Sequence, residues 1–405
     1  MSNLDMLYRN KNQWFLNRKE KISDLFFEYF KEYPSSFFSS PGRIEVIGNH
    51  TDHNNGLVLV SSIDLDIIAA VKKTNDGKVQ IYSEGYKENI VSIDDLKIKD
   101  EEMGNSVSIV RGTLNRFREL GYKIGGFKAV TSSNIFKGAG LSSSAAYELL
   151  VADILNSLYN DNQISRTEMA KIGQYAENVY FNKPSGLLDQ MGVAIGGFNY
   201  IDFKNNNEPI IENFNFELKD YRIVLVNTGG SHNNLTKYYK RIKDDMIKVA
   251  SFFNKNTLRE VSEEDFYKAL PLLKRKLGGR AILKAIHYYD ENKRVRLAYE
   301  ALKNDDIEAF LKQINESGES SYKLLQNCFI DKDEKQGIAL ALELSKKYIK
   351  DGACRVHGGG FKGTIIAFVS IKEQIEYIEK MKEIFGQRNV VKVSLRPLGV
   401  SLIKE

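Results

Sequence analysis

Cysteine and long apolar runs are scarce in this chain. Only two of its 405 residues are cysteines, Cys328 and Cys354. They are too few for a disulfide framework, and they lack the spaced partners of a zinc site. No uninterrupted apolar run approaches the ~20 residues that a membrane-spanning helix needs, and the first ten residues are too polar for a signal peptide. We therefore expect a cytoplasmic protein with no membrane partner.

A concentrated basic region is also missing. The formal net charge is +5, but the 58 Lys and Arg residues are spread among 53 Asp and Glu residues and form no long block. We therefore expect no nucleic-acid partner. The composition, 42% hydrophobic and 27% charged, is typical of a globular protein. The length is large for a single hydrophobic core, so we expect two domains.

The apolar patterns of the first half predict strands mixed with helices. A helix is predicted over 4–33, and a later helix ends at Tyr159. Ser165 and Glu168 form a capping-box pattern that predicts another helix start. The predicted strands fall at 44–47, 57–60, 67–71, 78–82, 127–132 and 198–203.

A polar turn at 205–209 separates this half from a helix-rich second half. We place the division between the domains there, which gives domains of residues 1–210 and 211–405. The second half predicts helices at 234–254, 263–276, 293–316, 334–349 and 372–385, and strands at 221–226, 363–369, 390–394 and 399–403.

A glycine-rich turn with three consecutive hydroxyls, Gly138-Ala-Gly-Leu-Ser-Ser-Ser-Ala-Ala146, stands just before a strong helix pattern. Glycines let a backbone approach an anion closely, and the first turn of a helix offers unpaired N–H groups and the positive end of a dipole. The serine hydroxyls suit phosphate or Mg²⁺. The segment is therefore a candidate phosphate site, although a helix start rich in Gly and Ser, taken alone, is more often an ordinary cap.

Polar side chains are dense in the segment from Ser40 to Leu59. They offer donors and acceptors that suit a polyhydroxylated ligand, although composition alone favours a solvated hairpin loop. Two histidines with an aspartate resemble metal ligands, but no fourth ligand is identifiable, which argues against zinc. The polar residues of the segment include Arg43, Glu45, Asn49, His50, Thr51, Asp52 and His53.

Asp189 lies among apolar residues in the segment 182–197, where an unpaired carboxylate is unfavourable. A cation such as Arg43 would keep it ionised and suited to act as the general base of a phosphoryl transfer. The alternative is a helix cap or an ordinary salt bridge. Glu177, on the preceding predicted helix, is a candidate Mg²⁺ ligand, although most glutamates in such positions face water.

Four glycines fall within the six residues 358–363, just before an apolar strand pattern. They predict a tight loop that another group approaches closely. Neither a Walker A pattern nor the catalytic-loop set of the protein kinases occurs in the sequence. A nucleotide-using enzyme built from these loops must therefore belong to another class.

The three loop segments, in this order, resemble the three motifs of the GHMP kinases. Pro41-Gly-Arg43, Ile47-Gly-Asn-His-Thr-Asp52 and Gly56-Leu-Val-Leu59 resemble the galactokinase signature, Gly140-Leu-Ser-Ser-Ser-Ala145 resembles the second motif, and Gly358-Gly-Gly-Phe-Lys-Gly363 resembles the third. The resemblance implies an α+β fold of two domains, ribosomal-S5-like and then ferredoxin-like, with the active site between them. It also implies ATP-dependent phosphorylation of the anomeric hydroxyl of galactose. We expect a monomer or a weak homodimer.

The resemblance also assigns roles to single residues. Asp189 resembles the catalytic aspartate and Arg43 the arginine beside it, while Ser143 or Ser144 with Glu177 would hold Mg²⁺. The ATP phosphates would be bound by Gly138, Ala139, Gly140, Leu141, Ser142, Ser143 and Ser144. The sugar would be contacted by Asn49, His50, Asp52, Gly186 and Tyr239, with Tyr238 as the alternative to Tyr239.

The first and third motifs depart from the family pattern. Asn49 stands where the family usually has glutamate, Glu45 where it has asparagine, His53 where it has tyrosine and Lys362 where it has glycine. Because the missing glutamate faces the hydroxymethyl end of the sugar in the family, galacturonic acid or another C6-altered sugar is an alternative substrate.

Two further alternatives concern the class of protein. A non-catalytic sugar-sensing regulator would share the fold, but the serine turn and Asp189 are both intact here. A kinase for homoserine or mevalonate is disfavoured by the sugar-type loop at residues 49–52.

We expect Lys362 either to reach a phosphate or to point outward.

Overall fold

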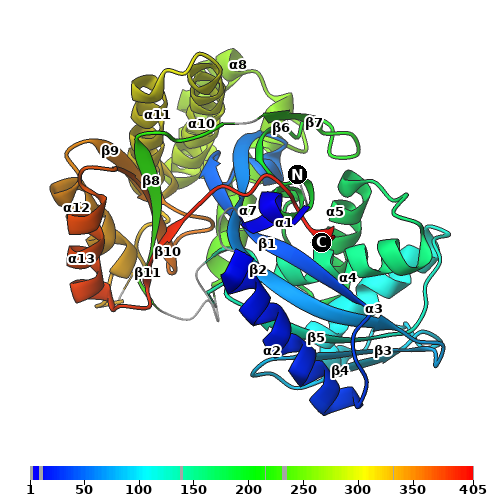
Figure 1. Ribbon diagram of the computed structural model, residues 1–405. Helices are drawn as coiled ribbons and strands as arrows, with labels where there is room; N and C mark the ends of the chain where they lie inside the picture. Colours follow the sequence, from blue (N-terminus) through cyan, green and yellow to red (C-terminus); the bar gives the residue numbers. More distant parts are fainter. Residues whose placement is uncertain are drawn as a thin grey trace.

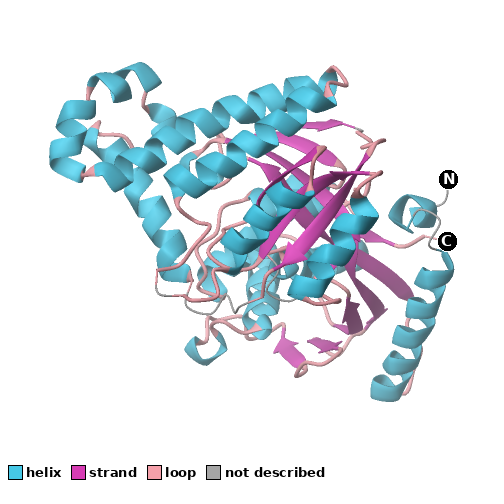
Figure 2. Ribbon diagram, turned by 90° about the vertical axis from the view of Figure 1, so that its left-hand side faces the viewer, coloured by secondary structure: helices cyan, strands magenta, loops and turns pink. Residues whose placement is uncertain are grey.

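Two β-sheets form the framework of the computed structural model, which describes residues 3–8, 12–136, 140–214, 216–229, 235–331 and 333–404 (Figure 1). The larger sheet has the strand order β12-β1-β2-β5-β3-β4, with β6 paired to β2 and β7 paired to β6. The smaller sheet has the order β11-β8-β10-β9. A group of helices extends away from the sheets on the left of Figure 2. None of the described helices is long and apolar enough to cross a membrane.

The first half of the chain builds most of the larger sheet. Its elements are α1 (Asn3–Tyr8), α2 (Asn12–Phe30), β1 (Ser36–Ile47), β2 (Leu57–Lys73), β3 (Lys78–Ser83), β4 (Asn89–Ser92), α3 (Ser106–Glu119), β5 (Phe127–Ser133), α4 (Ser143–Tyr159), α5 (Arg166–Tyr175), α6 (Leu188–Ile195), β6 (Phe198–Asp202) and β7 (Ile210–Phe214). The N-terminus of α5 is capped as its sequence predicts, because the Ser165 side chain accepts a hydrogen bond from the backbone N–H of Glu168.

The second half supplies the smaller sheet and the group of helices. Its elements are β8 (Tyr221–Asn227), α7 (Thr236–Phe252), α8 (Glu263–Lys268), α9 (Leu270–Leu277), α10 (Gly279–Lys303), α11 (Ile307–Ser320), α12 (Gly337–Tyr348), β9 (Gly352–Val356), β10 (Thr364–Ser370), α13 (Gln374–Phe385), β11 (Val390–Val393) and β12 (Ser401–Leu402).

The long β1–β2 hairpin differs from the sequence prediction. The runs 57–60 and 67–71, predicted as two strands, belong to one strand of 17 residues. Polar residues interrupt the apolar pattern between them, but Ser61, Ser62 and Asp66 are all buried and hydrogen-bonded within the fold. Satisfied polar groups can therefore continue a buried strand that the hydrophobic pattern alone divides.

The helical prediction at 293–316 was also wrong. The chain there forms two helices: α10 begins at Gly279 and ends at Lys303, and α11 begins at Ile307. Asp305 has a φ of 56°, which no continuing helix adopts. The side chain of Asp306 then caps α11 by accepting from the backbone N–H of Ala309 at 2.9 Å.

The polar turn at 205–209 joins β6 and β7, which pair antiparallel in the larger sheet. The change of sheet falls between Phe214 and Tyr221, where β8 begins the smaller sheet. The last residues return to the larger sheet, because β12 pairs with β1. The division of the chain at residue 210 stays a prediction. The C-terminal strand β12 belongs to the second predicted domain in sequence but pairs with β1 of the first.

Asp66 joins the N-terminal helices, the larger sheet and the C-terminal segment. Its fully buried carboxylate pairs with Arg18 at 2.6 Å and with Arg396 at 3.4 Å. It also accepts a hydrogen bond from the Tyr8 hydroxyl at 2.7 Å. The Ser39 hydroxyl donates to it as well, so the burial of this carboxylate is compensated by two guanidinium groups and two hydroxyls, whose residues lie far apart in the sequence.

Replacing Asp66 by alanine would leave two largely buried guanidinium groups without their carboxylate. We expect Asp66→Ala to lower the free energy of unfolding by about 3–5 kcal/mol, measured by urea denaturation. Asp24→Ala, at an exposed position on α2, is the control and should change it by less than about 0.5 kcal/mol. An unchanged unfolding midpoint for Asp66→Ala would contradict the assigned role.

Candidate active site

An ion pair joins β1 to the start of α6. Arg43 donates from Nε to Asp189 Oδ1 at 2.9 Å, and its Nη2 lies 2.7 Å from the same oxygen. Gly192 allows the approach, because a Cβ there would lie 2.5 Å from Val60 Cγ2 and 3.1 Å from Arg43 Cβ. The structure thus brings together the two residues that the sequence predicts as base and charge stabiliser.

The serine turn lies against this ion pair. The Ser142 hydroxyl donates to Asp189 Oδ2 at 2.6 Å, and Arg43 Nη1 donates to the Gly140 carbonyl at 2.8 Å. Burial raises the pKa of Asp189, but the Arg43 charge and the Ser142 hydroxyl outweigh this and hold it below its ordinary value. Asp189 is therefore ionised at neutral pH.

The other serines of the turn lie at the start of α4. Ser142 has a φ of 58°, and its side chain does not cap α4. The N–H groups at the start of α4 therefore donate no hydrogen bond to the Ser142 hydroxyl. Ser143 is exposed at the first position of the helix. Gly138 and Ala139, predicted to bind ATP, lie outside the described residues.

Glu177 lies behind the serine turn rather than facing water. It is 1% exposed on a π-helical turn, Ala176–Tyr180. Its Oε1 accepts from Ser144 Oγ at 2.9 Å, while its Oε2 accepts from Ser185 Oγ at 2.6 Å and from Gln190 Nε2 at 3.0 Å. Ser144 and Glu177, predicted as metal ligands, are therefore together, whereas no contact joins Ser143 to this carboxylate among the described side chains.

Four of the predicted sugar contacts lie in two neighbouring pairs, Asp52 with Gly186 and His50 with Tyr239. A Cβ on Gly186 would lie 1.8 Å from Asp52 Oδ2, so only glycine fits beside that carboxylate. The rings of His50 and Tyr239 lie 6.3 Å apart, and His50 Nε2 lies 3.0 Å from the Gly359 carbonyl. Burial, together with Asp189 and Glu45, raises the pKa of Asp52 to about 7.

Tyr238 and Lys362 take other positions. The ring of Tyr238 packs against Phe361 at 5.0 Å, whereas Tyr239 lies beside His50. Lys362, which replaces a glycine of the family pattern, forms an ion pair with Asp333 at 3.1 Å. In this structure it points to a neighbouring carboxylate.

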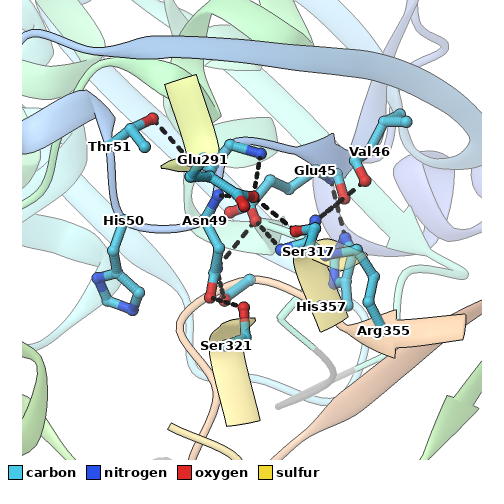
Figure 3. Close-up of polar contacts among 12 residues, drawn as sticks. Glu45, Val46, Asn49, His50, Thr51, Glu291, Ser317, Ser321, Arg355 and His357 are labelled. Carbon is cyan, nitrogen blue, oxygen red and sulfur yellow. Dashed lines mark hydrogen bonds and ion pairs between the residues drawn. The ribbon is translucent and has the colours of Figure 1, made fainter. Parts of the chain in front are cut away.

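Asn49 does not lie where the sequence comparison put it. Its side chain is fully buried, and its Nδ2 donates to Glu45 Oε1 at 2.9 Å and to the Gly358 carbonyl at 2.6 Å (Figure 3). Its Oδ1 accepts from Asn327 Nδ2 at 2.8 Å and from Ser321 Oγ at 3.4 Å. Both polar atoms already have partners within the protein, so the amide supports the loop from behind instead of facing a ligand.

Glu45 connects the first loop to the third. Arg355 Nη2 lies 2.9 Å from Glu45 Oε1, and both side chains are buried (Figure 3). The backbone N–H of Glu45 donates to His357 Nε2 at 3.0 Å. The pKa of His357 is well below its ordinary value because of its burial and the nearby Arg43 and Arg355 charges. Arg355 and His357, just before the glycine-rich third segment, thus attach it to β1.

One face of α10 holds the backbone of the sugar-type loop, a contact that the sequence analysis does not predict. His287 Nε2 lies 2.9 Å from the Asn49 carbonyl, Tyr288 donates to the Asn54 carbonyl at 3.0 Å, and the Asn292 side chain accepts from the Leu57 N–H at 2.7 Å. Between them, Glu291 accepts from the N–H groups of Gly48 at 3.0 Å and Asn49 at 3.2 Å. Residues at these helical spacings share a face, a signal that was missed because the predicted helix began at 293.

Comparisons with known proteins agree with this geometry. A model of the galactokinase galactose-binding signature matches residues 24–73, and one of the GHMP kinases N terminal domain matches residues 108–197. The galactokinase of Clostridium perfringens is 31% identical over 374 residues, which are 90% of this chain and 93% of that protein. That of Clostridium tetani is 30% identical over 371 residues, 89% of this chain and 91% of that protein.

The fold gives the same result. The crystal structure of Lactococcus lactis galactokinase complexed with galactose superimposes with a TM-score of 0.84 at 26% identity, covering 95% of this chain and 99% of that one. A crystal structure of mevalonate kinase shares the fold, with a TM-score of 0.62 at 16% identity. The α+β fold predicted from the motifs is confirmed, and the chain belongs to the galactokinase family of the GHMP kinases.

Proposed function

We propose that this protein is an ATP-dependent sugar 1-kinase that transfers the γ-phosphoryl group of ATP to the anomeric hydroxyl of a hexose, with galactose as the first candidate. The observation that carries the proposal is the position of Asp189. Its carboxylate is kept anionic by Arg43 and is bonded directly to Ser142 of the serine turn. A base and a phosphate-binding turn in direct contact are what such a transfer requires.

Asp189 is suited to accept the proton of a sugar hydroxyl. A carboxylate offers about four acceptor positions. The protein fills three of them, with Arg43 Nε, Arg43 Nη2 and the Ser142 hydroxyl, which leaves one for a substrate hydroxyl. His50, Asp52 and Tyr239 orient the sugar beside it. Bound ATP supplies the phosphoryl group, and its transfer depends on positioning and electrostatic stabilisation more than on covalent chemistry.

The residues around Glu177 fit a bound Mg²⁺. Hydroxyl and carboxylate oxygens are the ligands that Mg²⁺ prefers, usually one or two carboxylates together with substrate phosphates. Ser144 and Glu177 provide such a pair at the start of α4. The described residues contain no group of three or more His, Cys, Asp or Glu side chains that could hold a metal ion, and the phosphates of a bound nucleotide would supply further ligands to Mg²⁺ here.

Removing the proposed base tests the reaction. We expect Asp189→Ala to reduce turnover by about 10²–10⁴-fold while sugar affinity changes much less, measured by ATP consumption and by calorimetry with galactose. Asp24→Ala is the control. Wild-type protein that binds a sugar but consumes no ATP on any hexose or uronic acid would instead identify a sugar-sensing regulator.

The pH dependence of the reaction tests the ion pair. Arg43 lowers the pKa of Asp189, so the wild-type base stays ionised well into the acidic range. In Arg43→Met the effect of burial is no longer opposed by the guanidinium, and the pKa of Asp189 rises. We expect the acidic limb of the kcat/KM profile to move to higher pH in this variant. An acidic limb that stays in place would show that another group controls it.

Substrate choice at C6 is tested by exchanging Glu45 and Asn49. Asn49→Glu alone would place a second buried carboxylate at the position bonded to Glu45 Oε1, and we expect it to lower the melting temperature. The double variant Glu45→Asn/Asn49→Glu keeps one carboxylate and one amide and restores the family pattern. Because the Asn49 amide supports the loop and does not face a ligand, we expect the ratio of kcat/KM for galactose to that for galacturonic acid to stay unchanged. A rise in this ratio would show that the side chain at position 49 takes part in C6 selection.

A further inference from the structure

A lysine occupies the carboxylate that the proposed Mg²⁺ would use. Lys183 Nζ lies 2.5 Å from Glu177 Oε1, the same oxygen that accepts the Ser144 hydroxyl. Its backbone is anchored as well, because the Lys183 N–H donates to the Glu177 carbonyl at 3.0 Å. A compact ammonium ion and a Mg²⁺ ion cannot both occupy this position on one oxygen.

The surroundings of Lys183 are those of the active site. Burial lowers the pKa of Lys183, but the Glu177 carboxylate, with contributions from Asp189 and Glu148, holds it above its ordinary value. In turn, the Lys183 charge lowers the pKa of Asp189 and opposes the rise in the pKa of Tyr239 caused by burial. Lys183 therefore stays a cation and acts on both the proposed base and a proposed sugar contact.

The side chain of Lys183 is partly exposed to solvent while its backbone is held. It is 43% exposed, whereas Glu177 is 1% exposed. The following turn is fixed, because Ser185 donates from its backbone to Asn178 Oδ1 at 2.8 Å and from its hydroxyl to Glu177 Oε2 at 2.6 Å. Only the flexible lysine stem must change rotamer for the ammonium to leave Glu177.

We propose that Lys183 is a nucleotide-phosphate ligand that Mg²⁺ displaces from Glu177. The inference rests on the proposed function, which places Mg²⁺ at Ser144 and Glu177. Without nucleotide, the ammonium neutralises this buried carboxylate. When the Mg²⁺–nucleotide complex binds, the ion takes Glu177 and the ammonium turns to the phosphate oxygens at the adjacent start of α4. Lysine suits this role because it binds phosphate as a point charge on a flexible stem.

The lysine variant should change two affinities in opposite directions. In Lys183→Met the competing cation is lost, so we expect Mg²⁺ alone, without nucleotide, to bind more tightly and to raise the melting temperature more than in wild type. The phosphate contact is lost too, so the Mg²⁺ complex of a non-hydrolysable ATP analogue should bind about tenfold more weakly, the effect of one charged hydrogen bond. Calorimetry and thermal shift measure both.

Matched variants complete the test. Lys171→Met removes a lysine from the neighbouring helix α5, where it donates to the Asn207 carbonyl, and should leave both affinities unchanged. Lys183→Arg keeps the charge and should retain most of the ATP affinity. Unchanged or weaker Mg²⁺ binding in Lys183→Met, or unchanged ATP binding, would overturn the inference and reduce Lys183 to a structural ion pair. Because neither readout needs turnover, failure of the kinase proposal would appear separately, as absence of ATP consumption by the wild-type protein.

Discussion

The ion pair between Arg43 and Asp189 is the interaction on which the site depends. Three segments that are distant in sequence meet at it: β1 supplies the guanidinium, α6 supplies the carboxylate, and the serine turn donates to one and accepts from the other. Arg43 is 4% exposed, so its charge acts in a medium of low polarity, where removing a single partner is strongly unfavourable. The same contact therefore sets the ionisation of Asp189 and the position of the turn that faces it.

A second set of polar contacts holds the opposite wall of the site. The sugar-type loop is bound through its backbone by α10, and its buried Asn49 and Glu45 are bound by the third loop and Arg355. Burial raises the pKa of Glu291, but Arg294, His287 and other neighbours outweigh it and bring the pKa to about 2. Because Glu291 is therefore ionised at neutral pH, its bonds to the loop N–H groups are charge-assisted and strong. The loop that carries the proposed sugar contacts thus owes its position to residues that are not themselves proposed to contact the sugar.

The sequence indicated the catalytic residues of the site better than the residues that hold the sugar-type loop in position. A carboxylate among apolar residues needs a cation, an argument that does not require the fold, and the family resemblance indicates Arg43 as the cation beside Asp189. The role of α10 escaped prediction because its start was not recognised, and β2 was divided because polar residues interrupt its apolar pattern. Asn49 was assigned to the sugar because a motif shows which residue is present but not which way its side chain points. The departures at 45 and 49 are understandable only once the two side chains are seen bonded to each other.

The path of the chain end has a consequence for synthesis. The last strand, β12, lies along β1 at the edge of the larger sheet, and the Ile403 N–H donates to the Phe37 carbonyl at 2.8 Å. Arg396, only a few residues earlier, completes the buried cluster around Asp66. When only the first 210 residues have been synthesised, neither β12 nor Arg396 is present to make these contacts. The N-terminal portion emerges with an open sheet edge and an incompletely compensated acidic group, and its final consolidation waits until residues 396–403 have been translated.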